Sequence, residues 1–158
     1  MMIAALKKAI TASISDVLET MFFMVIEFNE TDKEALCAVL KRSILRGAAL
    51  RFNGPFSGEF TLLAPLDLLK GMAVDFMGES PDNITMTHAD ETLKEALNMI
   101  VGNTFSHYDD TILFTIGIPE VMKEKEINGV CEGDEKESIL FKVRTEDNEI
   151  LLKLAIWE

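Results

Sequence analysis

Residues 90–110 restrict the fold of this chain more than any other stretch of its sequence. Their apolar side chains recur three and four positions apart, a spacing that places them on one side of an α-helix. The positions that share this stripe are Leu93, Leu97, Ile100, Val101, Thr104 and Phe105. We therefore expect a long amphipathic helix, with this stripe packed against a core and the opposite face turned toward solvent.

The outward face of the expected helix carries Glu91, Glu95, Asn98 and Gly102 at helical spacing. A solvated helix face normally mixes acids with lysines, and a glycine inside a helix costs roughly 1 kcal/mol relative to alanine. One interpretation is a solvated face, on which Glu91 is only a capping acid and Gly102 only serves close packing. The other interpretation is a contact surface, where Gly102 lets a partner approach the helix backbone.

The remaining periodicity predicts an α+β protein in which long helices pack on an antiparallel-rich sheet. Helical spacing indicates a first helix from residue 2 into residues 21–25 and a short helix from Pro65 to Gly78. Alternation of apolar and polar residues indicates strands at residues 48–52, 58–63, 112–118, 139–145 and 150–157. Pro119 closes the third of these strands, because proline cannot donate to a sheet ladder.

Some local features are less regular. Residues 34–45 fit a helix and a strand equally well, and residues 123–137 form a charged, glycine-containing stretch that we expect to be a disordered loop. Thr87 with Asp90, or Asp90 alone, is expected to cap the long helix, because such side chains accept hydrogen bonds from the free amides of a first turn. No internal repeat is evident in the sequence.

Composition places the chain among globular proteins. Its 158 residues, 48% of them hydrophobic and 27% charged, are enough for a single domain, residues 1–158, with its own core. A net charge of −12 argues against nucleic-acid binding, which needs clustered Lys and Arg.

The apolar run at residues 21–26 is far shorter than the ~20 residues that span a bilayer, so we expect no membrane segment. Cys37 and Cys131 lie far apart without a CxxC spacing, which favours a reduced, cytoplasmic protein.

The sequence lacks the familiar motifs of self-contained enzyme sites. His88 and His107 have no Cys or His at ligand spacing, so we expect no metal site and place both histidines at the surface. A GxSxG elbow, a phosphate-binding glycine loop with lysine, and a cysteine paired with a base are all missing. We therefore expect no cofactor of the protein's own.

The segment Glu95-Ala-Leu-Asn98, on such a helix and followed by a β-rich stretch with Ile118-Pro119, resembles the active-site signature of the CheC/CheX family of chemotaxis phosphatases. The resemblance is closest to CheX-like members with a single site. The family pattern is Asp or Ser, three residues, Glu, two residues, Asn, about 22 residues and Pro. This chain departs from the pattern in having Glu91 at its first position and a slightly shorter distance from Asn98 to Pro119.

The resemblance covers about residues 48–157 and implies a reaction. A family member would hydrolyse the aspartyl phosphate of a phosphorylated, CheY-like receiver, which brings its own Mg²⁺. By resemblance, Asn98 would position the hydrolytic water and Glu95 would pair with the receiver's lysine. Glu91 and Gly102 would then be partner-binding positions on the same helix face.

Two-site members of the family carry a further Glu and Asn pair on their first helix. Here Ser15, Glu19 and Phe22 fall at the matching spacings, with an aromatic ring in place of the amide, so the resemblance implies one working site. The simpler alternative is that Ser15 and Glu19 belong to the solvated face of a packing helix.

The resemblance also suggests an assembly and leaves a second function open. We expect a homodimer, because CheX-like members pair and because residues 150–157 form an apolar strand that a sheet edge would expose. The alternative function is a non-catalytic, receiver-binding scaffold of the flagellar-switch type. The altered position 91 and the short spacing to Pro119 favour the scaffold, whereas the presence of both Glu95 and Asn98 favours the phosphatase.

Overall fold

The computed structural model describes residues 2–30, 34, 38, 44–130 and 138–157. Its helical elements are α1 (Met2–Ser15), the π-helical turn η1 (Asp16–Met21), α3 (Leu66–Met77), the short 3₁₀ turn η2 (Pro81–Asn83), α4 (Met86–Tyr108) and α5 (Glu124–Gly129). Its strands are β1 (Glu27–Glu30), β2 (Leu45–Asn53), β3 (Ser57–Pro65), β4 (Thr115–Ile116), β5 (Glu120–Val121), β6 (Ser138–Arg144) and β7 (Glu149–Trp157).

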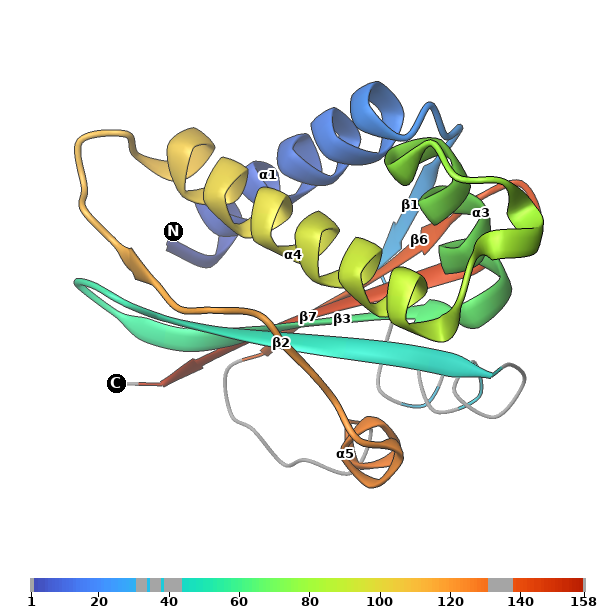
Figure 1. Cartoon of the computed structure of the whole chain (residues 1–158). Coiled ribbons are helices and arrows are strands. Elements are labelled where there is room, and N and C mark those ends of the chain that lie inside the picture. The colour runs from blue at the N-terminus through green and yellow to red at the C-terminus, as the bar shows by residue number, and fades with distance from the viewer. Residues whose placement is uncertain (1, 31–33, 35–37, 39–43, 131–137, 158) are drawn as a thin grey trace.

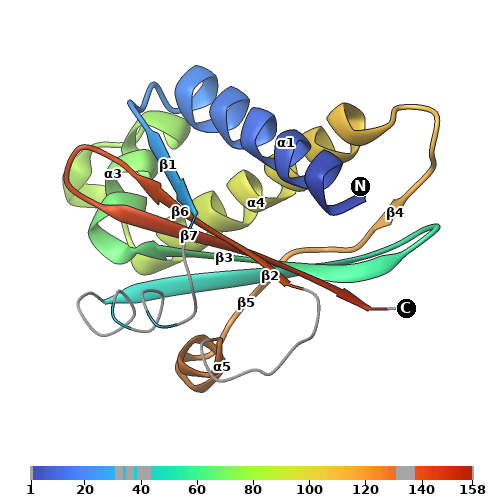
Figure 2. The ribbon, with the colours of Figure 1, turned by 180° about the vertical axis from the view of Figure 1, so that it is seen from behind.

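All of these strands belong to one antiparallel sheet, in the order β1-β6-β7-β3-β2-β4, with β5 also paired to β2. Helices α1, α3 and α4 cover one face of the sheet, and α5 lies on the other face (Figures 1 and 2). The α+β class expected from the sequence, with long helices packed on an antiparallel sheet, is confirmed. That the whole of residues 1–158 forms one domain stays a prediction.

The main core lies between the helices and the inward side of the sheet. The stripe expected on the long helix is buried as predicted at Leu93, Leu97, Ile100, Val101, Thr104 and Phe105. It packs against inward residues of the strands, among them Leu50, Phe52 and Phe60. At one end of α4 the ring of Phe105 stacks on that of Phe114, with 4.0 Å between centroids. A smaller cluster of Leu63, Ile127 and Leu151 holds α5 on the opposite face.

The start of α4 differs from the expectation. The helix begins at Met86, so both predicted caps, Thr87 and Asp90, lie inside it. Thr85 is the N-cap residue: its hydroxyl accepts from the His88 backbone N–H, while His88 Nδ1 accepts from the Thr85 N–H. Thr85 and Thr87 are equally suitable caps by residue type, so the sequence alone does not decide between them.

Three further expectations are corrected. The strand predicted at 112–118 pairs with β2 only at Thr115–Ile116, and the chain rejoins β2 as Glu120–Val121 after Pro119. The expected loop at 123–137 contains α5, and residues 131–137 lie outside the described part, as does most of 34–45. The strand predicted at 150–157 exists but is central, since β7 pairs with β6 on one side and β3 on the other.

The sheet has an internal two-fold arrangement that the sequence does not reveal. The β2–β3 hairpin and the β6–β7 hairpin lie side by side, joined through β3 and β7. Phe60 faces Leu154 and Leu62 faces Leu152 across this seam, so each hairpin contributes positions of the same kind. β1 pairs with β6 on the outside of one hairpin, as β4 and β5 pair with β2 on the outside of the other.

Candidate functional site

The outward face of α4 carries the side chains that the sequence singled out. Glu91, Glu95 and Asn98 are exposed and Gly102 is half-buried, and all lie on the side of α4 opposite its buried stripe. Within the described residues, neither Glu95 nor Asn98 forms a hydrogen bond or an ion pair with another side chain. A free carboxylate and a free amide one turn apart can therefore both engage a second molecule, the amide as donor and as acceptor.

Glu91 has a local partner. Its carboxylate lies 2.9 Å from Lys94 Nζ, and its side chain is 53% exposed. Since α4 begins at Met86, Glu91 is well inside the helix, and the interpretation of Glu91 as a capping acid is wrong. The residue is instead part of a mixed-charge border at one end of the exposed face.

Gly102 extends the same face without a side chain. A Cβ atom built at this position would meet no other atom within 4 Å, apart from the helix's own backbone. Close packing inside the protein therefore does not explain the glycine. Space above its backbone is open to a partner.

An ion pair that sequence reasoning missed fixes α4 on the sheet. Arg46 of β2 donates from Nε and from its second nitrogen to the two carboxylate oxygens of Asp90, at 2.8 and 2.7 Å. This hydrogen-bonded pairing with Asp90 raises the pKa of the Arg46 guanidinium above its ordinary value. The available signal was an arginine two residues before Ala48 and four before Leu50, on the inward side of an alternating strand.

Other contacts hold the rest of α4 in place. The Ser13 hydroxyl of α1 donates to the backbone oxygen of Ile100, which ties the two helices together where both are buried. At the end of α4, Asp109 accepts hydrogen bonds from the Thr111 hydroxyl and backbone N–H, and these lower the pKa of the Asp109 carboxyl. The exposed pair of Glu95 and Asn98 therefore stands on a helix that is anchored along its length.

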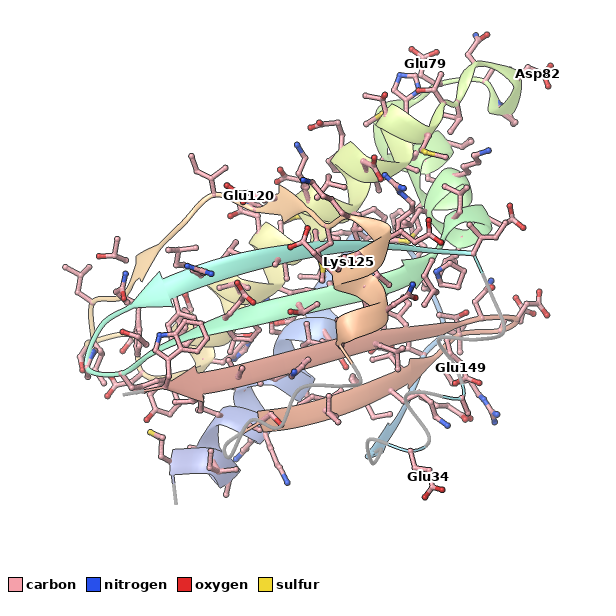
Figure 3. The ribbon with its side chains drawn as sticks, turned by 90° about the horizontal axis from the view of Figure 1, so that it is seen from below. Glu34, Glu79, Asp82, Glu120, Lys125 and Glu149 are labelled. Carbon is pink, nitrogen blue, oxygen red and sulfur yellow. The ribbon has the colours of Figure 1, made fainter. Side chains whose placement is uncertain are left out.

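The chain around Pro119, the proline of the sequence pattern, follows β2 along the edge of the sheet. After β4 the Gly117 N–H donates to the Arg51 oxygen at 2.8 Å, the chain turns at Pro119, and Met122 donates to the Gly47 oxygen. β5 follows Pro119 directly and contacts α4. Figure 3 shows Glu120 of β5 at this edge of the sheet. The segment that directly follows Pro119 therefore lies against α4.

Both histidines have structural partners. His88 completes the cap of α4, and His107 Nε2 lies 2.8 Å from Asp16 Oδ2 of η1, to which Asn103 also donates. Among the residues that the structure describes, no three His, Cys, Asp or Glu side chains are grouped to hold a metal ion. Cys37 and Cys131 lie outside the described residues.

The proposed equivalents of the site on the first helix do not form a similar face. Glu19 is exposed on the π-helical turn, whereas Phe22 is only 4% exposed and belongs to the main core. A site needs its side chains on one outward surface, and these positions do not share one. The expectation of a single working site stays a prediction.

Comparison with solved structures shows the same fold in several proteins. CheX from Vibrio vulnificus has a TM-score of 0.72 at 14% identity, over 96% of each chain. CheX in a CheX–CheY–BeF₃–Mg²⁺ complex from Borrelia burgdorferi has a TM-score of 0.69 at 16% identity, over 96% of this chain and 97% of that one. FliY from Thermotoga maritima has a TM-score of 0.57 at 16% identity, over 93% and 83%.

Sequence comparison identifies the family more directly. No sequence among the curated proteins matches the chain. The described residues include no helix with the length and apolar character needed to cross a bilayer. A family model described as chemotaxis phosphatase CheX, however, matches residues 46–142, a region that contains both Glu95 and Asn98. Because this region is more than half of the 158 residues, the chain belongs to the CheX family of chemotaxis phosphatases.

Proposed function

We propose that this protein hydrolyses the aspartyl phosphate of a CheY-like receiver by adding two side chains to the receiver's own site. The observation that carries the proposal is the pair of Glu95 and Asn98, exposed one turn apart on an anchored helix and engaged by nothing in the described part of the chain. Membership of the CheX family and the fold shared with a CheX bound to CheY support it.

The chemistry requires little from this protein. An aspartyl phosphate is an acyl phosphate, and its hydrolysis needs a water in line with phosphorus, opposite the leaving carboxylate. The water oxygen bonds to phosphorus as the bond to the aspartyl oxygen breaks, giving inorganic phosphate and a free carboxylate, with the water's proton passing to a phosphoryl oxygen or to solvent. Asn98 holds that water through its amide, which does not titrate near neutral pH.

The other positions of the α4 face serve docking. Glu95 pairs with the receiver's lysine and fixes the register of the two proteins. The open backbone at Gly102 lets the receiver surface come close, and Glu91 with Lys94 borders the contact. The Mg²⁺ belongs to the receiver, and this protein contributes no cofactor. These roles place the protein in the cytoplasm with its receiver.

A receiver-binding scaffold is the second candidate. Glu91 at the first motif position and the short distance from Asn98 to Pro119 favour it. The shared fold does not separate the two candidates, because FliY and CheX proteins are both similar to this chain.

Release of phosphate from a phosphorylated receiver separates the two functions. A phosphatase accelerates release catalytically, at protein concentrations far below that of the receiver, and chelation of Mg²⁺ abolishes turnover. A scaffold binds the receiver without changing its rate of dephosphorylation. Turnover that survives chelation would contradict the proposed sharing of the receiver's site.

A further inference from the structure

A groove of about 670 Å³ opens at one end of the molecule, remote from the Glu95 and Asn98 pair. It is formed by the turn between β2 and β3, the end of α4 and the last residues of β7, which Figure 1 shows gathered at the end where N and C are marked. Its main side chains are those of Phe56, Tyr108 and Trp157. Tyr108 follows Glu95 by 13 positions, which is about 20 Å along the axis of an α-helix.

Contacts between aromatic rings hold the walls of this groove. The ring of Phe56 meets that of Tyr108 edge to face, with 5.9 Å between centroids, and meets that of Phe114 at 5.2 Å. Phe114 in turn stacks on Phe105, which belongs to the main core. Gly54 permits this packing, since a Cβ atom there would lie 2.6 Å from the Phe114 ring. The groove is therefore preformed, and a ligand does not have to order these rings when it binds.

The groove combines a neutral surface with two hydrogen-bond donors. None of the described side chains that line it is charged. Within the described residues, neither the Tyr108 hydroxyl nor the Trp157 indole N–H takes part in a hydrogen bond. Side chains of this kind have an apolar body and a polar tip, and both parts can contact one ligand. A fitting ligand is therefore apolar along its sides and carries free acceptors.

Strand addition does not explain how a peptide would bind here. At Gly58, β3 is paired with Ile156 of β7 on one side and with Phe52 of β2 on the other. The backbone of β3 beside the groove thus has no free edge for a further strand. Recognition of a peptide at this place has to use the aromatic side chains.

A polyproline II segment has the required chemistry. Its backbone makes no internal hydrogen bonds, so its carbonyl groups are free to accept, and its proline rings are apolar. Aromatic-lined grooves bind such segments with little loss of conformational entropy, because the segment is ordered before it binds. Asp109 and Asp110 directly follow Tyr108, and Asp110 is exposed. A basic residue at one end of the segment is attracted by these carboxylates.

The chain itself does not supply such a segment. Its four prolines stand at positions 55, 65, 81 and 119, so that consecutive prolines are at least ten positions apart. A second copy therefore has no proline-rich stretch to insert into the groove. The occupant with matching chemistry comes from another protein.

We propose that the groove binds a proline-rich, basic segment of another protein in the polyproline II conformation. This inference does not depend on the proposed function, because the groove and the Glu95 and Asn98 pair occupy different parts of α4. It gives the protein a second surface, by which a partner holds it in place while the outward face of α4 stays open.

The single tryptophan of the chain reports on the groove directly, because it is Trp157. The chain is titrated with the synthetic peptide Arg-Ala-Leu-Pro-Pro-Leu-Pro and with the same residues in reverse order, since the groove does not fix the direction of the segment. One of these peptides should change the emission of Trp157 until it saturates at one peptide per chain. Replacement of its prolines by alanine should weaken binding by about tenfold or more, because the preformed conformation is lost.

Variants of the groove locate the bound peptide. Tyr108→Phe removes one donor but keeps the ring, so binding measured by calorimetry should weaken by about threefold to tenfold, the scale of one hydrogen bond. Trp157→Ala should weaken binding by about tenfold or more, as expected for an aromatic anchor. Phe23→Ala is the matched control: Phe23 is an aromatic side chain that is 83% exposed, beyond η1 and thus at the other end of α1 from the groove. Circular dichroism checks that each variant folds.

The possible outcomes separate this inference from other uses of the groove. If neither peptide changes the emission or releases heat with the folded chain, the inference is wrong. Equal affinity for the alanine peptide would show apolar adhesion without recognition of the polyproline conformation. An emission that shifts with protein concentration in the absence of peptide would show that a second copy covers the groove. An equal loss of binding in Phe23→Ala and Trp157→Ala would place the peptide elsewhere.

Discussion

At the scale of single residues, Glu95 and Asn98 share an exposed helix face but have different tasks in the proposed reaction. The amide acts on a water during the chemical step, whereas the carboxylate acts on a charge that is present before and after it. Their substitutions should therefore alter different measurable quantities, binding in one case and turnover in the other. Neither side chain packs in the core, so stability should stay close to that of the unmodified protein.

Asn98→Ala should lower turnover by roughly 10²–10³, the scale seen when one positioned hydrogen-bonding group is lost from a site. Receiver binding and melting temperature should not change. Steady-state phosphate release measures turnover, and a titration with a receiver that carries beryllium fluoride and Mg²⁺ as a stable phosphoryl mimic measures binding. Asn103→Ala is the matched control, since it removes an amide from the same helix that bonds only Asp16. Full turnover in Asn98→Ala would show that this helix face is not the active site.

Glu95→Lys should instead abolish docking, because it sets like charges against each other at a contact, which can cost several kcal/mol. The apparent affinity for the phosphoryl mimic should fall accordingly. Glu19→Lys reverses an exposed charge on η1 and serves as the control, with unchanged binding expected. Normal affinity in Glu95→Lys would remove the carboxylate from the proposed interface.

His88→Gln should leave turnover within a small factor of the unmodified protein. His88 Nδ1 accepts from the Thr85 N–H, and glutamine at this third helical position can accept the same hydrogen bond as part of a capping box. His107→Gln, which affects only a surface contact to Asp16, should behave similarly. Phosphate release with each variant tests this, and a large loss in either would indicate a histidine in the chemistry.

At the scale of elements, α4 was the most predictable part of the molecule and the edges of the sheet the least. Helical spacing alone predicted its buried stripe, because a 3.6-residue period in a long segment has few alternatives. The site residues could be predicted as exposed for the same reason. Arg46 was not found, because a partner of Asp90 on a distant strand is set by tertiary packing and not by local pattern.

Strand order depends on the whole chain, and this is where prediction failed. β7 is apolar on both faces, with Leu151 and Leu152 both buried, a pattern typical of a strand inside a sheet rather than at its edge. The sequence carries this signal, and the expectation that residues 150–157 form a sheet edge is wrong. The sequence predicts one strand at 112–118 instead of the two short strands β4 and β5. Their pairing with β2 depends on the path of the chain around Pro119, which a local pattern does not specify.

Gly102→Ala should raise the stability of the protein and lower its activity. Alanine favours a helix interior over glycine by up to about 1 kcal/mol, and the position has room for a Cβ within the chain. A methyl group there would meet a receiver that approaches the backbone. Thermal melting and phosphate release measure both effects. Gly71→Ala on α3 is the matched control, because its Cβ also meets nothing within 4 Å and its site is remote. Unchanged turnover in Gly102→Ala would mean that no close approach occurs there.

At the scale of the whole molecule, the homodimer stays a prediction, but the structure changes the reason for expecting it. The apolar strand at 150–157 no longer supports it, since β7 is paired on both sides. Within the described residues β1 pairs with β6 alone, and an unpaired strand edge of this kind is commonly covered in an assembly. Light scattering at micromolar concentration should give twice the 17.6 kDa mass of the chain. A monomeric mass would show that a second copy of the chain does not cover this strand edge.

The two-fold arrangement within one chain has a consequence for how its halves can change. In a dimer of identical subunits every substitution appears twice, at both symmetry-related positions. Here the β2–β3 and β6–β7 hairpins occupy equivalent places in the sheet but are specified by separate parts of one sequence. A mutation can therefore alter one hairpin without touching the other, whereas residues that meet across the seam, such as Phe60 with Leu154, must remain compatible with each other. Joining the halves in one chain makes specialisation of a single half possible while the shared architecture is kept.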